Sequence, residues 1–260
     1  MSLASAQASA APLHFAPAGQ AAAAVLPLQT QCSSCHLRDL CLPCGMSGAE
    51  VDRLDGLMFT RRAIKAGKTL YHEGDPFQFI YAVRNGTFKT SLSLADGREQ
   101  VSGFQIAGEL LGLDGVADGK YASSATALED TMVCAIPYTH LAELALANAG
   151  MQRAVSRLMS REIVRDHSLM MLLGSMNAEE RLAAFLLNLS QRHKARGYSA
   201  SEFVLRMTRA EIGSYLGMKL ETVSRTFSAF QRQRLLEVTK RHIRILDMDA
   251  LMRVHLARIH

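Results

Sequence analysis

Residues 208–225 read TRAEIGSYLGMKLETVSR, and this stretch decides the fold of the C-terminal part of the chain. Thr208 and Glu211 have the spacing of a capping box, in which a hydroxyl and a carboxylate satisfy the free amides at the start of a helix. Gly217 can take the positive φ that a tight turn after Leu216 requires. A second helix is then expected from about Leu220 to Arg234, which predicts a helix-turn-helix.

The surrounding residues extend this prediction to a domain. Segments 236–238 and 243–246, joined through Lys240 and Arg241, predict a two-stranded wing, and a helix over about 177–196 precedes the helix pair. We therefore predict a winged helix-turn-helix over residues 176–260. Four apolar residues have the spacing to form its small core: Ile212, Leu216, Val223 and Phe227.

The start of the second helix carries Glu221, Ser224 and Arg225 on one face, because positions i, i+3 and i+4 are neighbours. Arginine donates two hydrogen bonds to guanine and glutamate accepts one from cytosine, so this face could read a G·C base pair. The alternative is an ordinary surface ion pair between Glu221 and Arg225. The predicted phosphate contacts are Thr222, Lys219 and Arg209.

Charge is unevenly distributed along the chain. Residues 175–260 contain 15 Lys and Arg against 8 Asp and Glu, a net charge of +7, whereas the other 174 residues carry −2. A basic C-terminal end on a near-neutral body suits an anionic partner such as nucleic acid, although a solvated basic surface would have the same composition.

Four of the five cysteines lie close together, and the fifth is Cys134. Packed thiolates repel one another unless a metal ion or an iron–sulfur cluster binds them. The four are Cys32, Cys35, Cys41 and Cys44, and by themselves they would also suit a tetrahedral zinc site. Cys134 could equally be a small buried hydrophobic residue of a strand.

The N-terminal region predicts the compartment. No Lys or Arg precedes Arg38, so the basic start of a signal peptide is missing, and the apolar run 21–26 is too short to cross a bilayer. We predict a cytoplasmic protein, in which thiols stay reduced. Residues 1–30 are rich in Ala, Ser and Pro and predict a disordered leader.

Residues 59–137 predict a β-roll. Asn85-Gly86 and Asp96-Gly97 are tight-hairpin signals, and between them Phe88, Thr90, Leu92 and Leu94 alternate with polar residues as in a half-buried strand. Many short strands at this spacing are typical of a roll or jelly roll. The predicted fold class is α+β, with the cysteine segment and the roll together spanning residues 31–147.

Residues 148–175 predict one long dimerisation helix. Its successive heptad a and d positions form a narrow seam that a second copy of the helix would bury, although packing on the roll is the alternative. The seam residues are Ser156, Met159, Ile163, Asp166, Met170 and Leu173. In a twofold dimer Asp166 faces its symmetry mate. Repulsion between the two carboxylates would leave the dimer only marginally stable, so that a modest input could tip the balance between monomer and dimer.

These motifs together resemble the FNR (fumarate and nitrate reduction) branch of the CRP/FNR transcription regulators, which respond to oxygen. The resemblance covers about residues 30–250. It is carried by Cys32-x2-Cys35-x5-Cys41, Gly108-Glu109-Leu110, Thr131-Met132-Val133-Cys134 before Ile136-Pro137, and segments 177–183 and 221–225.

The resemblance implies a sensing mechanism. A [4Fe–4S] cluster would be bound by Cys32, Cys35, Cys41 and Cys134, with Cys44 a spare thiol. The intact cluster would favour the DNA-binding homodimer without oxygen, and oxygen would convert it to a [2Fe–2S] form and loosen the dimer.

The resemblance also implies partners. Glu221, Ser224 and Arg225 would read TTGAT-type half-sites of a palindrome in double-stranded DNA, and RNA polymerase would be the protein partner in activating or repressing genes of anaerobic respiration. Cyclic-nucleotide-binding relatives place an arginine and a serine after the Gly-Glu-Leu turn, whereas residues 110–128 contain no arginine. Because a cyclic phosphate would lack its bidentate anchor, we expect no cyclic AMP binding, and we expect no membrane partner.

Three other interpretations are open. A regulator of the same fold could sense another ligand, such as a haem-bound gas held by His72 or His140. A DNA-binding protein could contain the zinc site without any sensing role. An enzyme or electron carrier could use the cysteines, but the chain has no G-x-x-x-x-G-K-[ST] loop and no paired acid/base motif, so we predict that it is not an enzyme.

Overall fold

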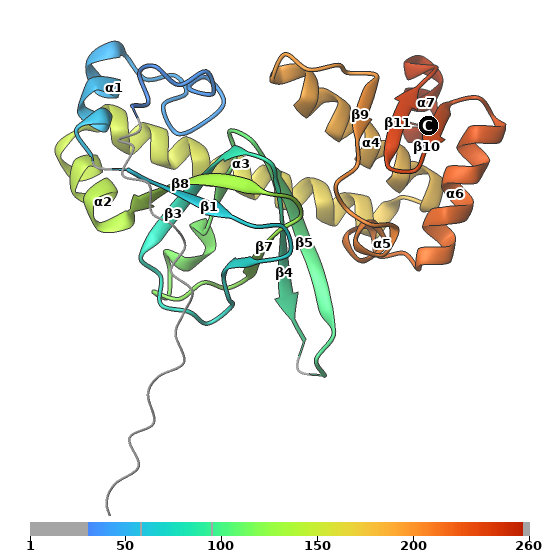
Figure 1. The fold of residues 1–260 in the computed structure, drawn as a ribbon, viewed down its shortest axis with the longest axis horizontal. Helices are drawn as coiled ribbons and strands as arrows, with labels where there is room; N and C mark the ends of the chain where they lie inside the picture. The colour runs from blue at the N-terminus through green and yellow to red at the C-terminus, as the bar shows by residue number, and fades with distance from the viewer. Residues whose placement is uncertain (1–30, 58, 95, 257–260) are drawn as a thin grey trace, which may run out of the picture.

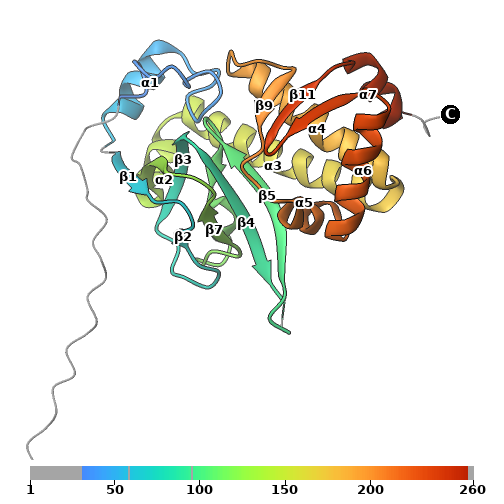
Figure 2. The same cartoon turned by 45° about the vertical axis from the view of Figure 1, so that its right-hand side comes forward.

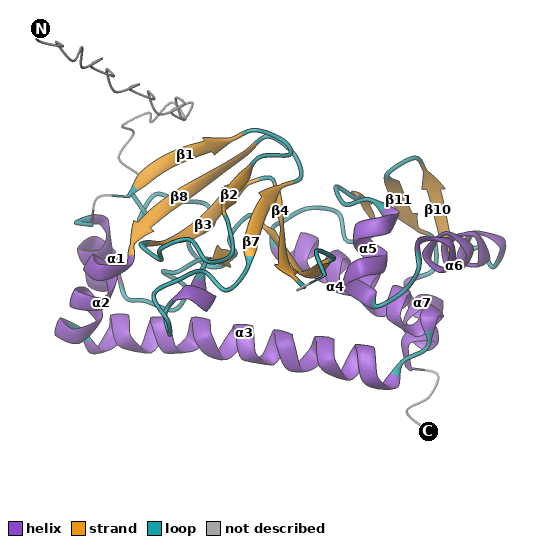
Figure 3. Ribbon diagram, turned by 90° about the horizontal axis from the view of Figure 1, so that it is seen from below, coloured by secondary structure: helices purple, strands orange, loops and turns teal. Residues whose placement is uncertain are grey.

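The computed structural model describes residues 31–256 except for residues 58 and 95, so the predicted leader lies outside the described residues. The described chain forms a β-roll, one long helix and a C-terminal helical domain, which confirms the predicted fold class (Figure 1). The long helix, α3 (Ala149–Ser175), runs beneath both the roll and the C-terminal domain (Figure 3).

The roll consists of two four-stranded antiparallel sheets, with strand orders β1-β8-β3-β6 and β2-β7-β4-β5. Aromatic side chains fill much of the space between them: Tyr71, Tyr81, Phe88 and Tyr121 are all buried there. The strands are β1 (Thr60–Ile64), β2 (Thr69–Tyr71), β3 (Phe79–Asn85), β4 (Thr87–Ser93), β5 (Glu99–Ile106), β6 (Leu110–Leu111), β7 (Ser124–Ala127) and β8 (Thr131–Pro137), with the short 3-10 helix η1 (Leu113–Gly115) after β6.

The two predicted hairpin turns have different roles. Gly97 has φ 82° and joins the paired strands β4 and β5, as expected. Gly86 also has a positive φ, of 81°, but β3 and β4 lie in different sheets. The Asn85-Gly86 hairpin prediction is therefore wrong: this turn carries the chain from one sheet to the other.

The predicted alternation along β4 is not found, because Thr87 and Ser91 of the expected polar face are buried as well. Phe88 and Thr90 are buried, whereas Leu92 and Leu94 are 40% and 45% exposed. The pairing of β4 with β5 shifts register between Thr90 and Ser91, and beyond this point the hairpin extends past the rest of the roll (Figure 2). Without a covering sheet, the outer leucines cannot be buried, so that part of the prediction is wrong.

Three helices close one end of the roll. They are α1 (Gly48–Asp55), α2 (Tyr138–Ala147), which the sequence did not predict, and the first half of α3. The side chain of Asn148 caps α3 by accepting hydrogen bonds from the amides of Gly150 and Met151. Leu42 of the cysteine segment and Leu158 of α3 share this apolar cluster, so the segment packs directly on the helix.

The C-terminal domain is the predicted winged helix-turn-helix. The four predicted core residues are all buried, and β10 pairs with β11 as the wing. The second helix ends at Arg232 rather than Arg234, because Arg234 takes a positive φ of 56° where the chain turns into β10. The elements are α4 (Ala178–Ala195), β9 (Glu202–Val204), α5 (Arg209–Leu216), α6 (Leu220–Arg232), β10 (Leu236–Thr239), β11 (His242–Ile245) and α7 (Met248–Leu256), of which β9 and α7 were not predicted.

Candidate functional site

Four of the five cysteines line one small cavity, of about 30 Å³, between the N-terminal segment and the roll. They are the four predicted ligands, Cys32, Cys35, Cys41 and Cys134. Cys134 comes from β8, where it pairs with Arg61 of β1 on one side and with Ala82 of β3 on the other. The centre of a sheet thus presents this thiol to a loop about ninety residues earlier in the chain.

The loop that carries the other three thiols is held by hydrogen bonds. The carboxylate of Asp55, at the end of α1, accepts from the amides of Cys32 and Ser33. Within the loop, the amide of Cys35 donates to the carbonyl of Cys32, and the amide of Cys44 donates to the carbonyl of Cys41. These hydrogen bonds fold the segment into successive tight turns.

Burial makes these thiols hard to ionise. It raises the pKa of Cys41 to about 12, and the neighbouring Cys134 and Cys35 raise it further, against a hydrogen bond from the backbone of Leu42. Burial also raises the pKa of Cys32, with a contribution from Cys41. Thiolates in this cavity therefore need a positive partner to be stable.

The donor set fits an iron–sulfur cluster, since four cysteine thiolates are its usual ligands. Across residues 31–57, 59–94 and 96–256, no three His, Cys, Asp or Glu side chains are grouped closely enough to hold a single metal ion. A guanidinium lies beside the set, because Nη1 of Arg84 is 3.9 Å from Sγ of Cys35.

Cys44 lies outside this cavity. Nη2 of Arg161 is 3.3 Å from its Sγ, and Nη2 of Arg157 donates to its carbonyl oxygen at 3.1 Å. Both arginines belong to α3. Cys44 is therefore held by α3 and does not line the cavity that the other four cysteines share.

The second half of α3 exposes apolar side chains. Of the predicted seam residues, Ile163 and Met170 are 53% and 60% exposed, and Asp166 is exposed beside them. Met159 and Leu173 are half-buried. The sequence missed Val164 and Met171, which are equally exposed and widen the seam.

The helix α6 presents the predicted base-reading residues to solvent. Glu221, Ser224 and Arg225 are all exposed on it. In the part of the chain that the structure describes, neither Glu221 nor Arg225 forms an ion pair, so the surface ion pair is not found. Both charged groups are free to reach a ligand.

Comparison with known proteins agrees with this arrangement. Residues 61–148 match the cyclic nucleotide-binding domain family, and residues 180–254 match the Crp-like helix-turn-helix domain family. The chain is 48% identical to the transcriptional regulatory protein btr of Bordetella pertussis, over 86% of this chain and 93% of that protein. It is 42% identical to the fumarate and nitrate reduction regulatory protein of Salmonella typhimurium, over 85% of this chain and 88% of that protein.

The same likeness holds in three dimensions. The solved structure of FixK2 from Bradyrhizobium japonicum matches with a TM-score of 0.70 and 30% identity, over 76% of this chain and 98% of that chain. The chain belongs to the FNR branch of the CRP/FNR family. It is a DNA-binding transcription regulator, and the helix-turn-helix is its DNA-reading domain.

The three predicted phosphate contacts of this CRP/FNR regulator differ in their surroundings. Lys219 is exposed at the N-cap of α6, and Thr222 is half-buried on the first turn. The guanidinium carbon of Arg209 lies 3.3 Å from the centroid of the Phe227 ring, and burial lowers the pKa of Arg209 to about 10. Its Nη1 atom has no hydrogen-bond partner among the described residues.

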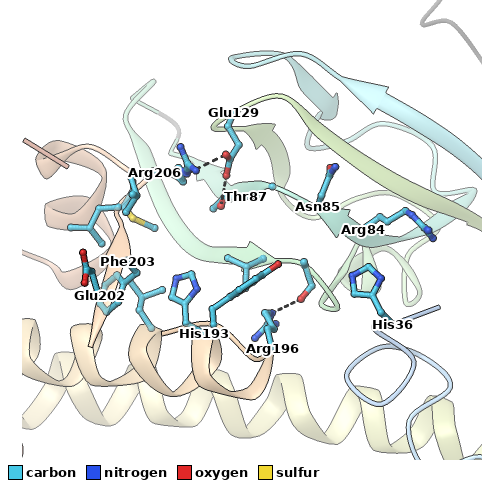
Figure 4. Close-up of a pocket in the computed structure, with 18 residues that line it drawn as sticks. His36, Arg84, Asn85, Thr87, Glu129, His193, Arg196, Glu202, Phe203 and Arg206 are labelled. Atoms are coloured by element: carbon cyan, nitrogen blue, oxygen red, sulfur yellow. Dashed lines mark hydrogen bonds and ion pairs between the residues drawn. The ribbon is translucent and has the colours of Figure 1, made fainter. Parts of the chain in front are cut away.

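A larger cavity, of about 490 Å³, lies between the roll and the DNA-reading domain (Figure 4). Arg206 and Glu129 form an ion pair across it at 3.1 Å, and Arg196 donates to the carbonyl of Ala107. His36, next to Cys35, belongs to its lining. Sequence patterns could not indicate this cavity, because its walls come from six separate segments: residue 36, residues 84–87, residues 106–107, residue 129, residues 189–196 and residues 198–207.

None of the helices within the described residues has the length and hydropathy to cross a lipid bilayer.

Proposed function

We propose that this protein is an oxygen-sensing transcription regulator whose cysteines hold an oxygen-labile [4Fe–4S] cluster. The observation that carries the proposal is the shared cavity of Cys32, Cys35, Cys41 and Cys134, from which Cys44 is excluded. The names of similar proteins, which include a fumarate and nitrate reduction regulatory protein, support the same function.

When bound, such a cluster supplies iron–sulfur bonds that oxygen can break. The protein supplies the rest of the sensor. Asp55 holds the start of the loop, and β8 fixes Cys134 opposite it, so the four thiols can act as one ligand set only while the loop is docked on the roll. Loss of the bound group would leave thiols whose ionisation burial opposes, and these would stabilise the docked loop less.

The second element of the proposal is a homodimer formed along α3. Exposed apolar side chains at heptad spacing are costly in water, and a second copy of α3 would cover them. Leu42 packs in the same cluster as Leu158, and Arg157 binds the carbonyl of Cys44, so the loop lies against the helix that would dimerise. A change in the loop would therefore act on α3 directly.

The third element is recognition of a palindrome. A twofold dimer would present two copies of α6, each with a free Glu221 and Arg225, to two half-sites of TTGAT type. RNA polymerase is the expected protein partner at promoters of anaerobic respiration. We expect no cyclic AMP binding, because the carboxylate of Glu109 is already bound by Arg192 and Arg196.

The experiment is a metal analysis and absorbance spectrum of protein purified without oxygen, repeated after exposure to air together with the oligomeric state. Broad absorbance near roughly 400 nm with about four irons per chain, lost in air as dimer becomes monomer, would support the proposal. A colourless protein with one zinc ion per chain that does not respond to air would contradict it.

A further inference from the structure

Glu109 lies where the roll, α3 and α4 meet, and its carboxylate is the centre of a group of arginines. Its Oε1 accepts from Nε of Arg192 at 2.9 Å and from Nη2 of Arg196 at 2.7 Å, and its Oε2 accepts from Nη2 of Arg192 at 2.5 Å. From α3, Nη2 of Arg165 lies 3.9 Å from Oε2. The Glu109 side chain is 10% exposed, so this charge depends on its arginine partners.

Arg192 on α4 and Arg196, the C-cap residue of α4, also bind backbone of the roll. Nη2 of Arg192 donates to the carbonyl of Phe104 at 2.6 Å, and Nε of Arg196 donates to that of Ala107 at 2.5 Å. The end of α4 is thus attached to the end of β5 through both side chains and backbone. A planar guanidinium that makes several hydrogen bonds is directional. Such groups therefore fix the orientation of α4 on the roll as well as the contact itself.

The same two domains also meet through aromatic packing and through separate hydrogen bonds elsewhere on β5. Phe104 of β5 packs on Phe185 of α4 and Tyr215 of α5, with ring centroids 6.1 Å and 5.3 Å apart. Apolar contact of this kind favours association without selecting one angle. Farther along β5, the amide of Val101 donates to Oγ of Ser214 at 2.9 Å. Hydrogen exchange at this amide therefore reports whether α5 is docked on the roll.

The turn that carries Glu109 also touches the cysteine loop. Gly108 has φ +87°, and a Cβ placed on it would lie 3.0 Å from Cβ of Leu40. Leu40 directly precedes Cys41. A displacement of the loop by about an ångström would therefore change the contact on this turn, because packed interiors transmit small shifts.

We propose that Glu109 is a positioning residue, which fixes the DNA-reading domain on the roll and links its orientation to the cysteine loop through the contact between Gly108 and Leu40. The second half rests on the proposed function, since it requires the loop to respond to its bound group. Arg165 of α3, which lies 3.9 Å from the Glu109 carboxylate, directly precedes Asp166. Glu109 is therefore also linked to the helix that carries the dimer seam.

The positioning role can be tested without metal or DNA. We expect Glu109→Gln in the full chain to raise hydrogen exchange by about tenfold in peptides covering β5 and α5, while β1 and β8 keep their wild-type protection. Arg192→Gln should give the same pattern, and the double variant should show less than the sum of the two single effects, because both changes break the ion pair between Glu109 and Arg192. The matched control is Asp130→Asn, which removes an acid that pairs with Lys65 on the surface of the roll.

Two outcomes would overturn this role: wild-type exchange of β5 and α5 in Glu109→Gln, or additive effects in the double variant. If Glu109→Gln also loosens the roll, Arg192→Lys decides the question. Lysine keeps the positive charge but loses the planar set of N–H donors of the guanidinium. A positioning role therefore predicts faster hydrogen exchange at Val101, whereas a role of charge alone predicts no change.

The link to the cysteine loop has its own readout. Affinity for a duplex with a TTGAT palindrome is measured for iron-loaded protein without oxygen and again after exposure to air. We expect the ratio of the two affinities to fall by about fivefold or more in Glu109→Gln at unchanged iron content. An unchanged ratio would overturn the link. If the wild type binds no iron, the proposed function fails, while the exchange experiment still decides the positioning role.

Discussion

Arg161 donates a hydrogen bond from Nη2 to Sγ of Cys44 at 3.3 Å, which ties the fourth N-terminal cysteine to helix α3. The other three N-terminal cysteines share their cavity with Cys134 of β8 instead. Two ligand sets that the sequence allowed, four local cysteines or three with Cys134, therefore become distinguishable. The choice matters because the set with Cys134 ties the loop to the roll.

The first prediction concerns these two cysteines. We expect Cys134→Ala to abolish retention of iron in protein purified without oxygen, because it removes the thiol that the roll supplies. Cys44→Ala should retain iron at the wild-type level. Iron and sulfide content and visible absorbance are the measurements, and the two alanine variants serve as matched controls for each other. The reverse result would assign the site to the four N-terminal cysteines.

The second prediction concerns base reading by α6. Arg225→Ala should weaken binding to the specific palindrome by about 1–3 kcal/mol, a factor of about 5 to 150, with little effect on unrelated duplexes. Arg225 is exposed and forms no ion pair within the described residues, so little stability should be lost. Binding curves on both duplexes are the measurement.

Lys219→Ala is the control for this variant. As a phosphate contact, Lys219 should contribute equally to all sequences, and its loss should reduce the slope of log affinity against log salt by about one per subunit. Equal losses on specific and unrelated DNA in Arg225→Ala would show that Arg225 does not read a base.

The third prediction concerns Asp166 on the exposed seam of α3. Asp166→Ala should tighten the dimer measured in air by about tenfold, since contacts between like charges contribute roughly 0.5–3 kcal/mol. Ile163→Glu, on the same seam, should weaken the dimer. Sedimentation equilibrium gives both constants. If the dimer constant of Asp166→Ala equals that of the wild type, the two carboxylates do not face each other.

Local patterns in the sequence predicted local structure well. The capping box of Thr208 and Glu211 is present, since the Thr208 hydroxyl accepts from the amide of Glu211 at 3.2 Å. The long helix, α4 and the wing also lie close to their predicted ranges. These features depend on residues a few positions apart, so their interactions can be read from spacing.

Features that depend on distant contacts could not be predicted from spacing. The resemblance, rather than any spacing, placed Cys134 with the other cysteines. Leu92 and Leu94 have the alternation of a buried strand, but whether a second sheet covers them depends on how far the hairpin extends. The arginines around Glu109 come from residues more than fifty positions away, and nothing local distinguishes them from surface arginines.

The fourth prediction concerns Gly213, whose importance the sequence did not indicate. A Cβ on Gly213 would lie 2.5 Å from the carbonyl oxygen of Met218, where the two helices of the motif turn. We expect Gly213→Ala to lower the free energy of unfolding by about 1–3 kcal/mol. Gly174→Ala is the control, because its Cβ would meet nothing within 4 Å and it lies in a helix. Thermal unfolding should show a lower Tm for the first variant and an unchanged or higher Tm for the second.

The fifth prediction concerns the pH dependence of the Glu109 contacts. Burial alone would raise the pKa of Glu109, but the guanidinium groups of Arg192, Arg165 and Arg196 outweigh it, so the pKa lies below its ordinary value of 4.5. A carboxyl whose pKa falls on folding stabilises the folded state above its ordinary pKa, and this contribution is lost as the pH falls through the lowered value.

At neutral pH we expect Glu109→Gln to unfold with a free energy about 3 kcal/mol lower than the wild type, because it leaves arginines without their partner. Urea titrations at a series of pH values should show this difference beginning to shrink as the pH falls below about 4.5, where the unfolded chain binds the proton. The difference should be lost only once the pH falls through the lowered pKa of the folded carboxyl. Asp130→Asn should show a much smaller difference at neutral pH, because that carboxyl is exposed. A difference between Glu109→Gln and the wild type that stays constant from neutral to acidic pH would mean that the charge of Glu109 does not hold the two domains together.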